Sequence, residues 1–485
     1  MKRSACLTVA LFALFFLAGC GSLPLPKERE TAPVPSPTQY HITAELDAAE
    51  HTLSVLTDID WSCPADDLSA VKFYLYPNAY KEGHEVVTKD KVEAAYPGGS
   101  PSYGGSEILS ALCDVPVTDT SIGEDDMVLT MRLSRDLKKG ERVRFRITQK
   151  VTLACIKHRL GYAEGYYYLS GFYPVVCPFS EGVFLTYPYT PFGDPFRLET
   201  AEFSLDLSLP IGTACAASAE IVRREAQGST EIYSIASNSS REVAVVASKK
   251  MFVEKRSYGE KSLFYYYESG SDKERILSVI EDALRYYEEC FGAYPYSTYT
   301  VVSAPFFESG VEHAGLTVIS KDLSFAYKKK TILHETAHQW WFGKVGNDEF
   351  ASPWIDEGLA EYSAAAYYKA AGQEAVYREL VREAEDAYAV RLSVKGSEGV
   401  RFDLPLPELA DGYYDRVYAG GLLLFSTLAE RFGAERFHAA LRDFAERYAG
   451  KVATQGALIS SLSQSFEEDL SAFFQGWLTG VVPLQ

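Results

Sequence analysis

Two histidines four residues apart, followed after eighteen residues by a glutamate, constrain the fold of this chain more than any other feature. The histidines are His334 and His338 in the segment TILHETAHQWW, and the glutamate is Glu357 in PWIDEGLAEY. Residues four apart on a helix point from one face, so the two imidazoles can bind the same metal ion. A catalytic zinc ion takes three protein ligands and leaves one position open. The pattern therefore predicts two packed helices that hold one zinc ion through His334, His338 and Glu357.

Two further carboxylates accompany the predicted zinc ligands. Glu335 follows the first histidine and lies close enough to act on a water molecule at the metal. Glu361 lies four residues beyond Glu357 on the same helical face, where it can hydrogen-bond a ligand histidine from behind. Histidine pairs at this spacing also occur by chance in helices, so the prediction of zinc depends on the correctly spaced glutamate.

The hydrophobic pattern divides the chain into a β-rich part and an α+β part. Between Tyr40 and Lys250, segments such as VKFYLYP and AEFSLDLSLP alternate in strand-forming residues and are separated by Gly and Pro turns. Further on, SDKERILSVIEDALRYYEECFG carries one apolar helical face, and most of the chain beyond Lys328 has helical periodicity. We predict an all-β saddle or sandwich domain over residues 40–250, and a catalytic domain with a short sheet and a helical lobe over residues 251–485.

The first 39 residues are predicted to export and tether the protein. Residues 1–19 combine Lys2 and Arg3 with a short apolar run, which is the layout of a secretory signal. Leu17-Ala18-Gly19-Cys20 resembles the bacterial lipoprotein cleavage box, in which Cys20 becomes the lipidated first residue; an ordinary signal peptide is the alternative. Residues 20–39 form a Pro-rich, polar linker. We expect the protein on the extracytoplasmic face of a bacterial cell membrane, anchored through Cys20.

Charge and cysteine content limit the classes of binding partner and the kinds of cysteine site that can be expected. The formal charge is −19 and no long Lys/Arg run is present, so nucleic acid and anionic lipid headgroups are not expected as partners. The six cysteines that remain after Cys6 and Cys20 show no CxxC or other metal-ligand spacing. They can pair in an exported protein or stay buried as free thiols. The sequence leaves this choice and the oligomeric state open.

Three ordered motifs resemble the aminopeptidase N-like zinc peptidases of the gluzincin group. HETAHQWW followed by WIDEGLAEY is similar to that family's HExxHxW and WLNEGFAEY block. Residues 309–313 are similar to its GxMEN strand, and residues 417–422 to its YEKG segment. GDPF at residues 193–196 is similar to a segment of the family's N-terminal β-domain. The resemblance implies a thermolysin-like catalytic domain with one zinc ion per chain, in a short, lipid-anchored bacterial member.

The resemblance also implies a role for two groups beside the metal. Glu335 is expected as the general base, which takes a proton from the attacking water and returns one to the leaving amine. Tyr418 is expected to donate its hydroxyl to the developing oxyanion. Tyr413 and Tyr414 lie close to it in the sequence and are the alternative donors.

By the same resemblance, residues 309–315 form an edge strand that binds the substrate. Glu312 is expected to hold the free α-amino group of a peptide, because a buried ammonium needs a charge partner. Gly310 and Val311 are expected to pair with the peptide backbone. His313 stands where the family has Asn, which leaves the shape of this subsite open.

Three hypotheses of function follow. The first is a zinc aminopeptidase that acts on peptides with a free N-terminus. The second is a zinc endopeptidase in which Glu312 plays no part in anchoring an amine. The third is a lipid-anchored protein that binds peptides without cutting them. The preferred N-terminal residue cannot be read from the sequence.

Overall fold

The first half of the protein consists mainly of β-sheets, and along many of its strands buried and exposed side chains alternate. The computed structural model describes residues 37–123, 125–194, 196–270 and 272–481, which fold together as a single unit. In β1 (Thr38–Asp47), Tyr40, Ile42, Ala44 and Leu46 are buried, and the residues between them are exposed. Each such strand presents one apolar face to the core.

The described strands of the first half form four sheets. The largest has the order β15 (Glu220–Gln227), β16 (Thr230–Ser240), β13 (Ala201–Pro210), β1, β2 (Thr52–Ser62), β7 (Arg142–Thr152) and β4 (Gly105–Cys113). A second sheet has the order β10 (Val175–Val176), β3 (Leu68–Tyr74), β6 (Val128–Leu137) and β5 (Val117–Ile122). A third has the order β14 (Ala214–Ala217), β17 (Val245–Ser248), β9 (Tyr166–Leu169) and β8 (Leu160–Ala163), and β11 (Phe179–Ser180) pairs with β12 (Val183–Phe184).

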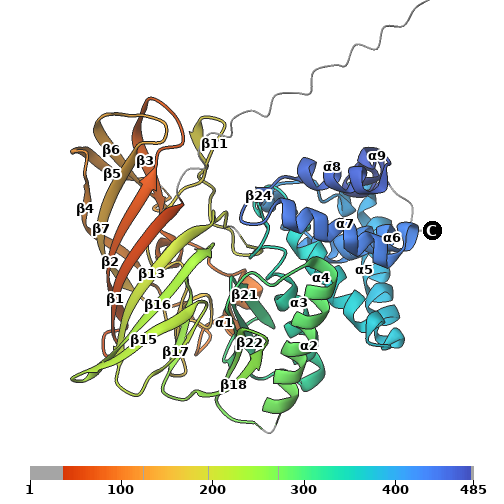
Figure 1. Ribbon diagram of the computed structural model, residues 1–485, viewed down its shortest axis with the longest axis horizontal. Helices are drawn as coiled ribbons and strands as arrows, with labels where there is room; N and C mark the ends of the chain where they lie inside the picture. The colour runs from red at the N-terminus through yellow and green to blue at the C-terminus, as the bar shows by residue number, and fades with distance from the viewer. Residues whose placement is uncertain (1–36, 124, 195, 271, 482–485) are drawn as a thin grey trace, which may run out of the picture. The chain divides into compact units, whose positions relative to one another are not determined.

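The second half combines a five-stranded sheet and the short pair β23 (Gly346–Asn347) and β24 (Val452–Ala453) with a group of helices (Figure 1). The larger sheet has the order β18 (Phe252–Tyr258), β19 (Lys261–Tyr267), β20 (Thr298–Ala304), β22 (Leu316–Ser320) and β21 (Gly310–His313), which places β21 at its edge. The helices are α2 (Lys273–Phe291), α3 (Phe325–Ala337), α4 (Trp354–Ala370), α5 (Glu374–Val400), α6 (Gly420–Phe432), α7 (Ala434–Arg447), α8 (Gln455–Phe466) and α9 (Ser471–Leu478). The prediction of an all-β part followed by an α+β part is confirmed. The domain boundaries stay a prediction, and β1 begins two residues before the expected start at Tyr40.

A buried arginine joins the two halves. Arg241 follows β16, is 2% exposed, and donates hydrogen bonds to three backbone carbonyls. The carbonyl of Leu198 accepts over 2.7 Å and that of Lys451 over 2.8 Å, and the third belongs to Phe342. Since Phe342 lies four residues after His338, this arginine connects the β-sheets directly to the end of the helix that carries the histidines.

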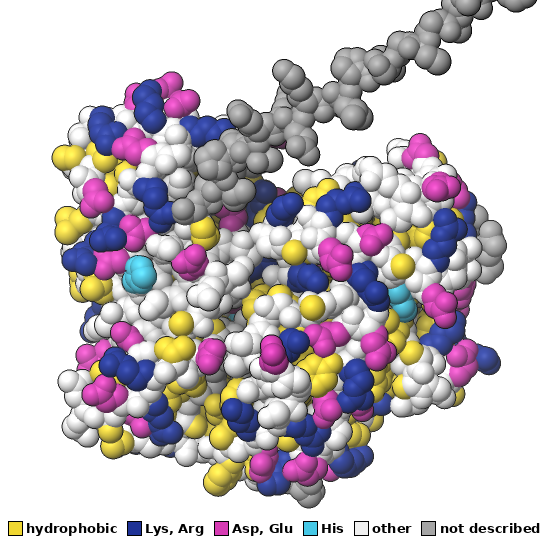
Figure 2. Space-filling view, viewed as in Figure 1, with side chains coloured by type: hydrophobic (Ala, Val, Ile, Leu, Met, Phe, Trp, Pro, Cys, Tyr) yellow, Lys and Arg dark blue, Asp and Glu magenta, His cyan; other side chains and the backbone are white. Residues whose placement is uncertain are grey.

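Surface charge and the state of the cysteines can be described for most of the chain. Figure 2 shows Lys and Arg side chains interspersed with Asp and Glu over the face drawn, without a basic region. The cysteines within the described residues are free thiols: Cys63, Cys113, Cys155, Cys177, Cys215 and Cys290. No helix in the described ranges is long and apolar enough to cross a membrane. The expected signal segment, the lipidated Cys20 and the linker up to residue 36 lie outside the described residues.

Candidate active site

The two histidines of the HETAH segment lie at the C-terminal end of α3. The helix begins after Ser324, whose side chain accepts a hydrogen bond from the backbone N–H of Tyr327. His334 lies in the last turn, and His338 directly follows the helix. Their Nε2 atoms are 3.1 Å apart. Both imidazoles therefore point to one position, as the spacing of the residues predicts.

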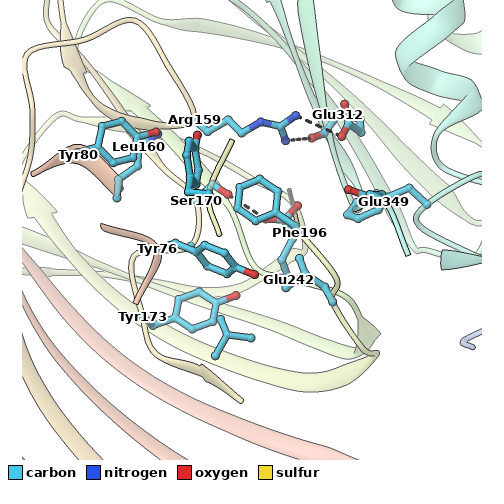
Figure 3. A pocket seen from close by; sticks show the side chains of 15 residues that line it. Tyr76, Tyr80, Arg159, Leu160, Ser170, Tyr173, Phe196, Glu242, Glu312 and Glu349 are labelled. Atoms are coloured by element: carbon cyan, nitrogen blue, oxygen red, sulfur yellow. Dashed lines mark hydrogen bonds and ion pairs between the residues drawn. The ribbon is translucent and has the colours of Figure 1, made fainter. Parts of the chain in front are cut away.

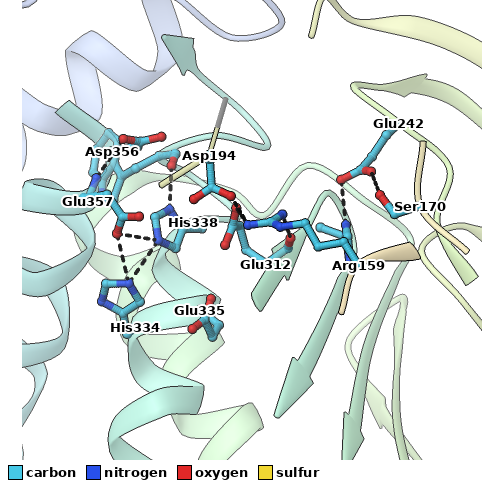
Figure 4. Close-up of polar contacts among 12 residues, drawn as sticks. Arg159, Ser170, Asp194, Glu242, Glu312, His334, Glu335, His338, Asp356 and Glu357 are labelled. Atoms are coloured by element: carbon cyan, nitrogen blue, oxygen red, sulfur yellow. Dashed lines mark hydrogen bonds and ion pairs between the residues drawn. The ribbon is translucent and has the colours of Figure 1, made fainter. Parts of the chain in front are cut away.

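Glu357 completes this group from the first turn of α4 (Figure 4). Its Oε2 atom lies 3.3 Å from Nε2 of His334 and 3.4 Å from Nε2 of His338. This oxygen is buried and makes no hydrogen bond within the described residues. One ligand atom from each of the three residues lies within 4.8 Å of the others. Two imidazole nitrogens and a carboxylate oxygen that converge in this way fit a zinc ion.

Two oxygen atoms lie behind the ligand histidines. Nδ1 of His338 donates a hydrogen bond to the backbone carbonyl of Trp341 over 3.1 Å. Nδ1 of His334 lies 3.4 Å from Oε1 of Glu361 but makes no hydrogen bond within the described residues, so the supporting role of Glu361 stays a prediction. A hydrogen on Nδ1 leaves Nε2 free to bind a metal. The role of the Trp341 carbonyl could not be predicted, because backbone atoms leave no sign in a sequence.

Burial and neighbouring charges set the protonation of the acidic groups. Burial opposes ionisation of Glu357, but its contacts with the two histidines hold its pKa well below the usual range. Burial, together with the nearby charge of Glu357, raises the pKa of Asp356 well above the usual range. Burial also raises the pKa of Glu335. The charge of Glu312 adds to this rise, whereas the two histidines reduce it. The contacts with the histidines thus favour the ionised form of Glu357, which suits binding of a cation.

Tyr418 reaches the metal ligands from a π-helical turn, Tyr414–Ala419, that precedes α6. Its hydroxyl donates a hydrogen bond to Oε1 of Glu357 over 2.5 Å. Its ring stacks on the imidazole of His334 with 5.8 Å between centroids. Of the alternative donors, Tyr413 is 4% exposed and Tyr414 is 57% exposed. Tyr418 is the tyrosine whose hydroxyl faces the predicted zinc ligands.

Two glycines allow Tyr418 to come this close. α4 and α6 meet at Gly358 and Gly421, next to the residues that carry the site. A Cβ atom on Gly421 would lie 2.5 Å from Cα of Gly358, and one on Gly358 would lie 2.9 Å from Cα of Gly421. These distances are shorter than van der Waals contact, so a side chain at either position would push the helices apart.

The edge strand β21 brings the expected amine-binding residue to the same place. Glu312 is 7% exposed, and Val311 before it is buried. A Cβ atom on Gly310 would lie 2.6 Å from Oε1 of Glu335, so the strand passes directly over the expected base. Gln339, next to the ligand His338, donates to the carbonyl of His313 over 3.1 Å. The C-terminal end of α3, which carries two of the predicted zinc ligands, and the edge strand are thereby fixed to each other.

The described side chains enclose two hollows on either side of Glu312. The larger is a cleft of about 470 Å³, lined by residues of both halves that include Glu312, His334, Glu335, Glu357 and Tyr418. The smaller is a cavity of about 30 Å³, shown in Figure 3. Glu312 lines both, so its carboxylate stands at the inner wall of the cleft.

Comparison with known proteins agrees with this geometry. Residues 276–477 match the model of the Peptidase family M1 domain. The second half of this chain carries an M1 peptidase domain. The resemblance to the aminopeptidase N-like zinc metallopeptidases is thereby confirmed. Because the matched range runs from α2 to α9, the M1 domain contains every predicted metal-binding and catalytic residue.

Individual relatives of the M1 domain give the same result at low identity. Aminopeptidase N of Streptomyces lividans is 25% identical over 222 residues, which cover 43% of this chain and 26% of that protein. Human endoplasmic reticulum aminopeptidase 2 is 25% identical over 205 residues, which cover 39% of this chain and 21% of that protein. The match thus spans about a quarter of the length of these curated relatives.

A solved structure shares the fold over almost the whole chain. The M1 zinc metallopeptidase of Deinococcus radiodurans aligns with a TM-score of 0.63 and 18% identity, covering 92% of this chain and 94% of that one. The likeness therefore extends beyond the M1 domain into the β-rich half. Residues of that half also line the cleft, among them Arg159 and Asp194, which sequence reasoning did not single out.

Proposed function

We propose that this protein is a zinc aminopeptidase that hydrolyses the first peptide bond of peptides with a free N-terminus. The observation that carries the proposal is that Glu312 lines the same cleft as His334, Glu335 and Glu357. A carboxylate beside a metal site gives an α-ammonium group its charge partner and places the first peptide bond next to the metal. The curated relatives of the M1 domain, which are named aminopeptidases, support the proposal.

The residues of the cleft can carry out the hydrolysis in two proton transfers. His334, His338 and Glu357 would hold a zinc ion, which would supply a Lewis acid for the scissile carbonyl and lower the pKa of water. Glu335 accepts a proton from the attacking water as the water oxygen bonds to the carbonyl carbon. Glu335 then donates that proton to the amine nitrogen as the C–N bond breaks. Both products leave with their atoms and charges balanced.

Tyr418 and the edge strand orient the substrate for these steps. The Tyr418 hydroxyl donates its one proton to Glu357 over 2.5 Å in this structure and would turn that donation to the oxyanion as it forms on the carbonyl oxygen. The outer edge of β21, which pairs with no further described strand, offers the backbone groups of Gly310 and Val311 to an extended peptide. Glu312 then limits cleavage to the first bond, because an acylated N-terminus supplies no charge to pair with it.

The proposal is tested with the purified chain that starts after Cys20. Aminoacyl fluorogenic amides are compared with their N-acetylated counterparts, with and without a zinc chelator. We expect chelator-sensitive cleavage of the free-amine substrates alone, and Glu312→Ala should abolish that preference. Cleavage of both sets would instead identify an endopeptidase, and cleavage of neither would favour a binding protein.

We further propose that the protein acts at a membrane surface. The support is Leu17-Ala18-Gly19-Cys20 and the Pro-rich segment that follows it. Full-length protein expressed in a bacterium should incorporate a labelled fatty acid and sediment with membranes. Cys20→Ala should lose both properties, and labelling that persists in this variant would contradict the proposal.

A further inference from the structure

Glu312 has a cationic neighbour that the proposed function does not use. Arg159, which precedes β8 in the β-rich half, approaches it twice: Nη2 lies 3.5 Å from Oε1 of Glu312, and Nη1 donates to the Glu312 backbone carbonyl over 3.4 Å. The same Nη2 atom forms an ion pair with Oδ1 of Asp194, from the GDPF segment. Figure 4 shows the guanidinium lying between the two carboxylates.

This arrangement poses an electrostatic problem for an aminopeptidase. The side chains of Arg159, Asp194 and Glu312 are 13%, 12% and 9% exposed, so water screens their charges weakly. A guanidinium paired fully with Glu312 would cancel the negative charge that a substrate ammonium needs. Arginine cannot lose its proton to relieve the conflict. Another anion must therefore balance Arg159 if Glu312 is to bind an amine.

We infer that Asp194 is that anion: it holds Arg159 as its own partner and so keeps Glu312 free for the α-ammonium of the substrate. The inference rests on the proposed aminopeptidase function. Asp194 is a positioning residue in this scheme, because it acts on the substrate through Arg159 and Glu312.

The charges of the group support this assignment. Asp194 and Glu312 contribute two negative charges and Arg159 one positive charge, so these three ion-paired side chains carry a net charge of −1 (−2 + 1), while Glu308 and Glu242 act on Arg159 from beyond ion-pair contact. One substrate ammonium brings the group to neutrality, which favours binding of the ammonium in a poorly hydrated cleft. The contacts also rank the two acids as partners of Arg159. The 3.5 Å contact with Glu312 is at the limit of a hydrogen bond, whereas the contact with Asp194 is close.

The contacts come from three separate parts of the chain. Arg159 is 35 residues from Asp194 and 153 residues from Glu312. The β-rich half thus supplies both the cation and the anion that control an acidic residue of the M1 domain. This gives the GDPF segment a function that its sequence alone does not indicate.

The test uses a pair of variants whose effects have opposite sign. Asp194→Asn keeps the shape of the side chain but leaves Glu312 as the only acid in ion-pair contact with Arg159 among the described residues. We expect KM for free-amine substrates to rise by about tenfold or more, with a smaller change in kcat. Asp194→Asn combined with Arg159→Met removes the competing cation, and most of the lost kcat/KM should return. Arg159→Met alone should not raise KM, because it removes the cation that competes with the substrate ammonium for Glu312; a raised KM in this variant would overturn the inference.

A matched control separates this effect from a general loss of an ion pair. Arg197 and Asp348 form a comparable pair, 3.3 Å apart with side chains 14% and 20% exposed, and neither residue lines the cleft or the small cavity beside Glu312. Asp348→Asn should leave KM unchanged. Thermal unfolding of each variant shows whether it folds. If Asp194→Asn does not fold, the KM of Arg159→Met provides the test.

The outcomes distinguish the inference from the proposed function. If the unmodified protein does not prefer free-amine substrates, the proposed function fails and the inference fails with it. If it does prefer them, an unchanged KM in Asp194→Asn overturns the inference alone. So does a double variant that is no more active than Asp194→Asn, since Asp194 would then bind the amine directly.

Discussion

The hydroxyl of Tyr418 donates a hydrogen bond to Oε1 of Glu357, and only 2.5 Å separates the two oxygen atoms. Glu357 thus uses one carboxylate oxygen for the tyrosine and turns the other toward both histidines. The same contact places the phenol beside the metal position, where a carbonyl oxygen of a bound peptide would develop negative charge.

Removal of that hydroxyl should slow the chemistry more than it weakens binding. For Tyr418→Phe we expect kcat to fall by about a hundredfold to a thousandfold, because a donor to the oxyanion is lost. KM and the zinc content should change little. Tyr414→Phe is the control, since the Tyr414 side chain is exposed whereas that of Tyr418 bonds to Glu357. Steady-state kinetics of both variants checks the prediction, and equal losses in the two would contradict it.

Replacement of the expected base should separate catalysis from metal binding. Glu335→Gln keeps the size of the side chain but cannot accept a proton, so we expect turnover to fall by about a hundredfold to ten-thousandfold. Zinc should stay bound at one ion per chain, because His334, His338 and Glu357 are unchanged. The measurement is the zinc content of the purified variant, determined together with its activity. Retained turnover would show that another group takes the proton.

A methyl group on the edge strand should disturb the base directly. In Gly310→Ala the new carbon would lie 2.6 Å from Oε1 of Glu335 and 2.5 Å from Cγ2 of Thr331. One of these groups must move, and a displacement of about 1 Å can cost about a hundredfold in rate. Gly456→Ala, on α8 with nothing closer than 3.9 Å, is the control and should retain full activity. Comparable kcat/KM for the two variants would argue against close passage of the strand.

Removal of zinc should lower stability as well as activity. A ligand that binds only the folded state at about 100 times its Kd stabilises the protein by about 2.7 kcal/mol. We therefore expect a chelator to lower Tm and added zinc to restore it. In His338→Gln, Tm should respond weakly to either treatment. A chelator-insensitive Tm in the unmodified protein would mean that the three converging ligands hold no zinc.

Acid should destabilise the protein partly through His158. Burial, with a smaller effect of Arg159, lowers the pKa of His158 to about 3, against about 6.5 in an unfolded chain. Between these values the unfolded state binds a proton that the folded state does not. The free energy of unfolding should therefore fall as the pH is lowered from about 6.5 toward 3, by at most about 1.4 kcal/mol per pH unit from this group.

The variant His158→Gln isolates that contribution. The glutamine cannot titrate and can still accept a hydrogen bond from Tyr80, whose hydroxyl lies 2.6 Å from Nδ1 of His158. Urea unfolding at pH 7, 6 and 5 should show a shallower loss of stability in the variant. His438, whose pKa is lowered to about 4, contributes equally to both proteins. Identical pH dependence would exclude His158 as a source.

Local spacing explains which parts of the site the sequence could predict. His334 and His338 share a helical face whatever surrounds them, and the expected second helix brings Glu357 and Glu361 to them. The choice among three neighbouring tyrosines was harder, because it depends on a π-helical turn that turns Tyr418 toward the ligands. Arg159 and Asp194 could not be predicted at all. Their contacts with the M1 domain join distant segments, and no periodic pattern marks such pairs.

The contact between Gly358 and Gly421 has a consequence for how this protein can change. At this contact the backbones of α4 and α6 touch directly, because neither glycine has a side chain. A change of side-chain rotamer therefore cannot alter the distance between the two helices here. The separation of Tyr418 from Glu357 is therefore set by atomic radii rather than by the fit of interchangeable side chains. Residues of the surrounding hydrophobic core can be substituted while the distance between Tyr418 and Glu357 is kept. Only the two glycines themselves have no substitute.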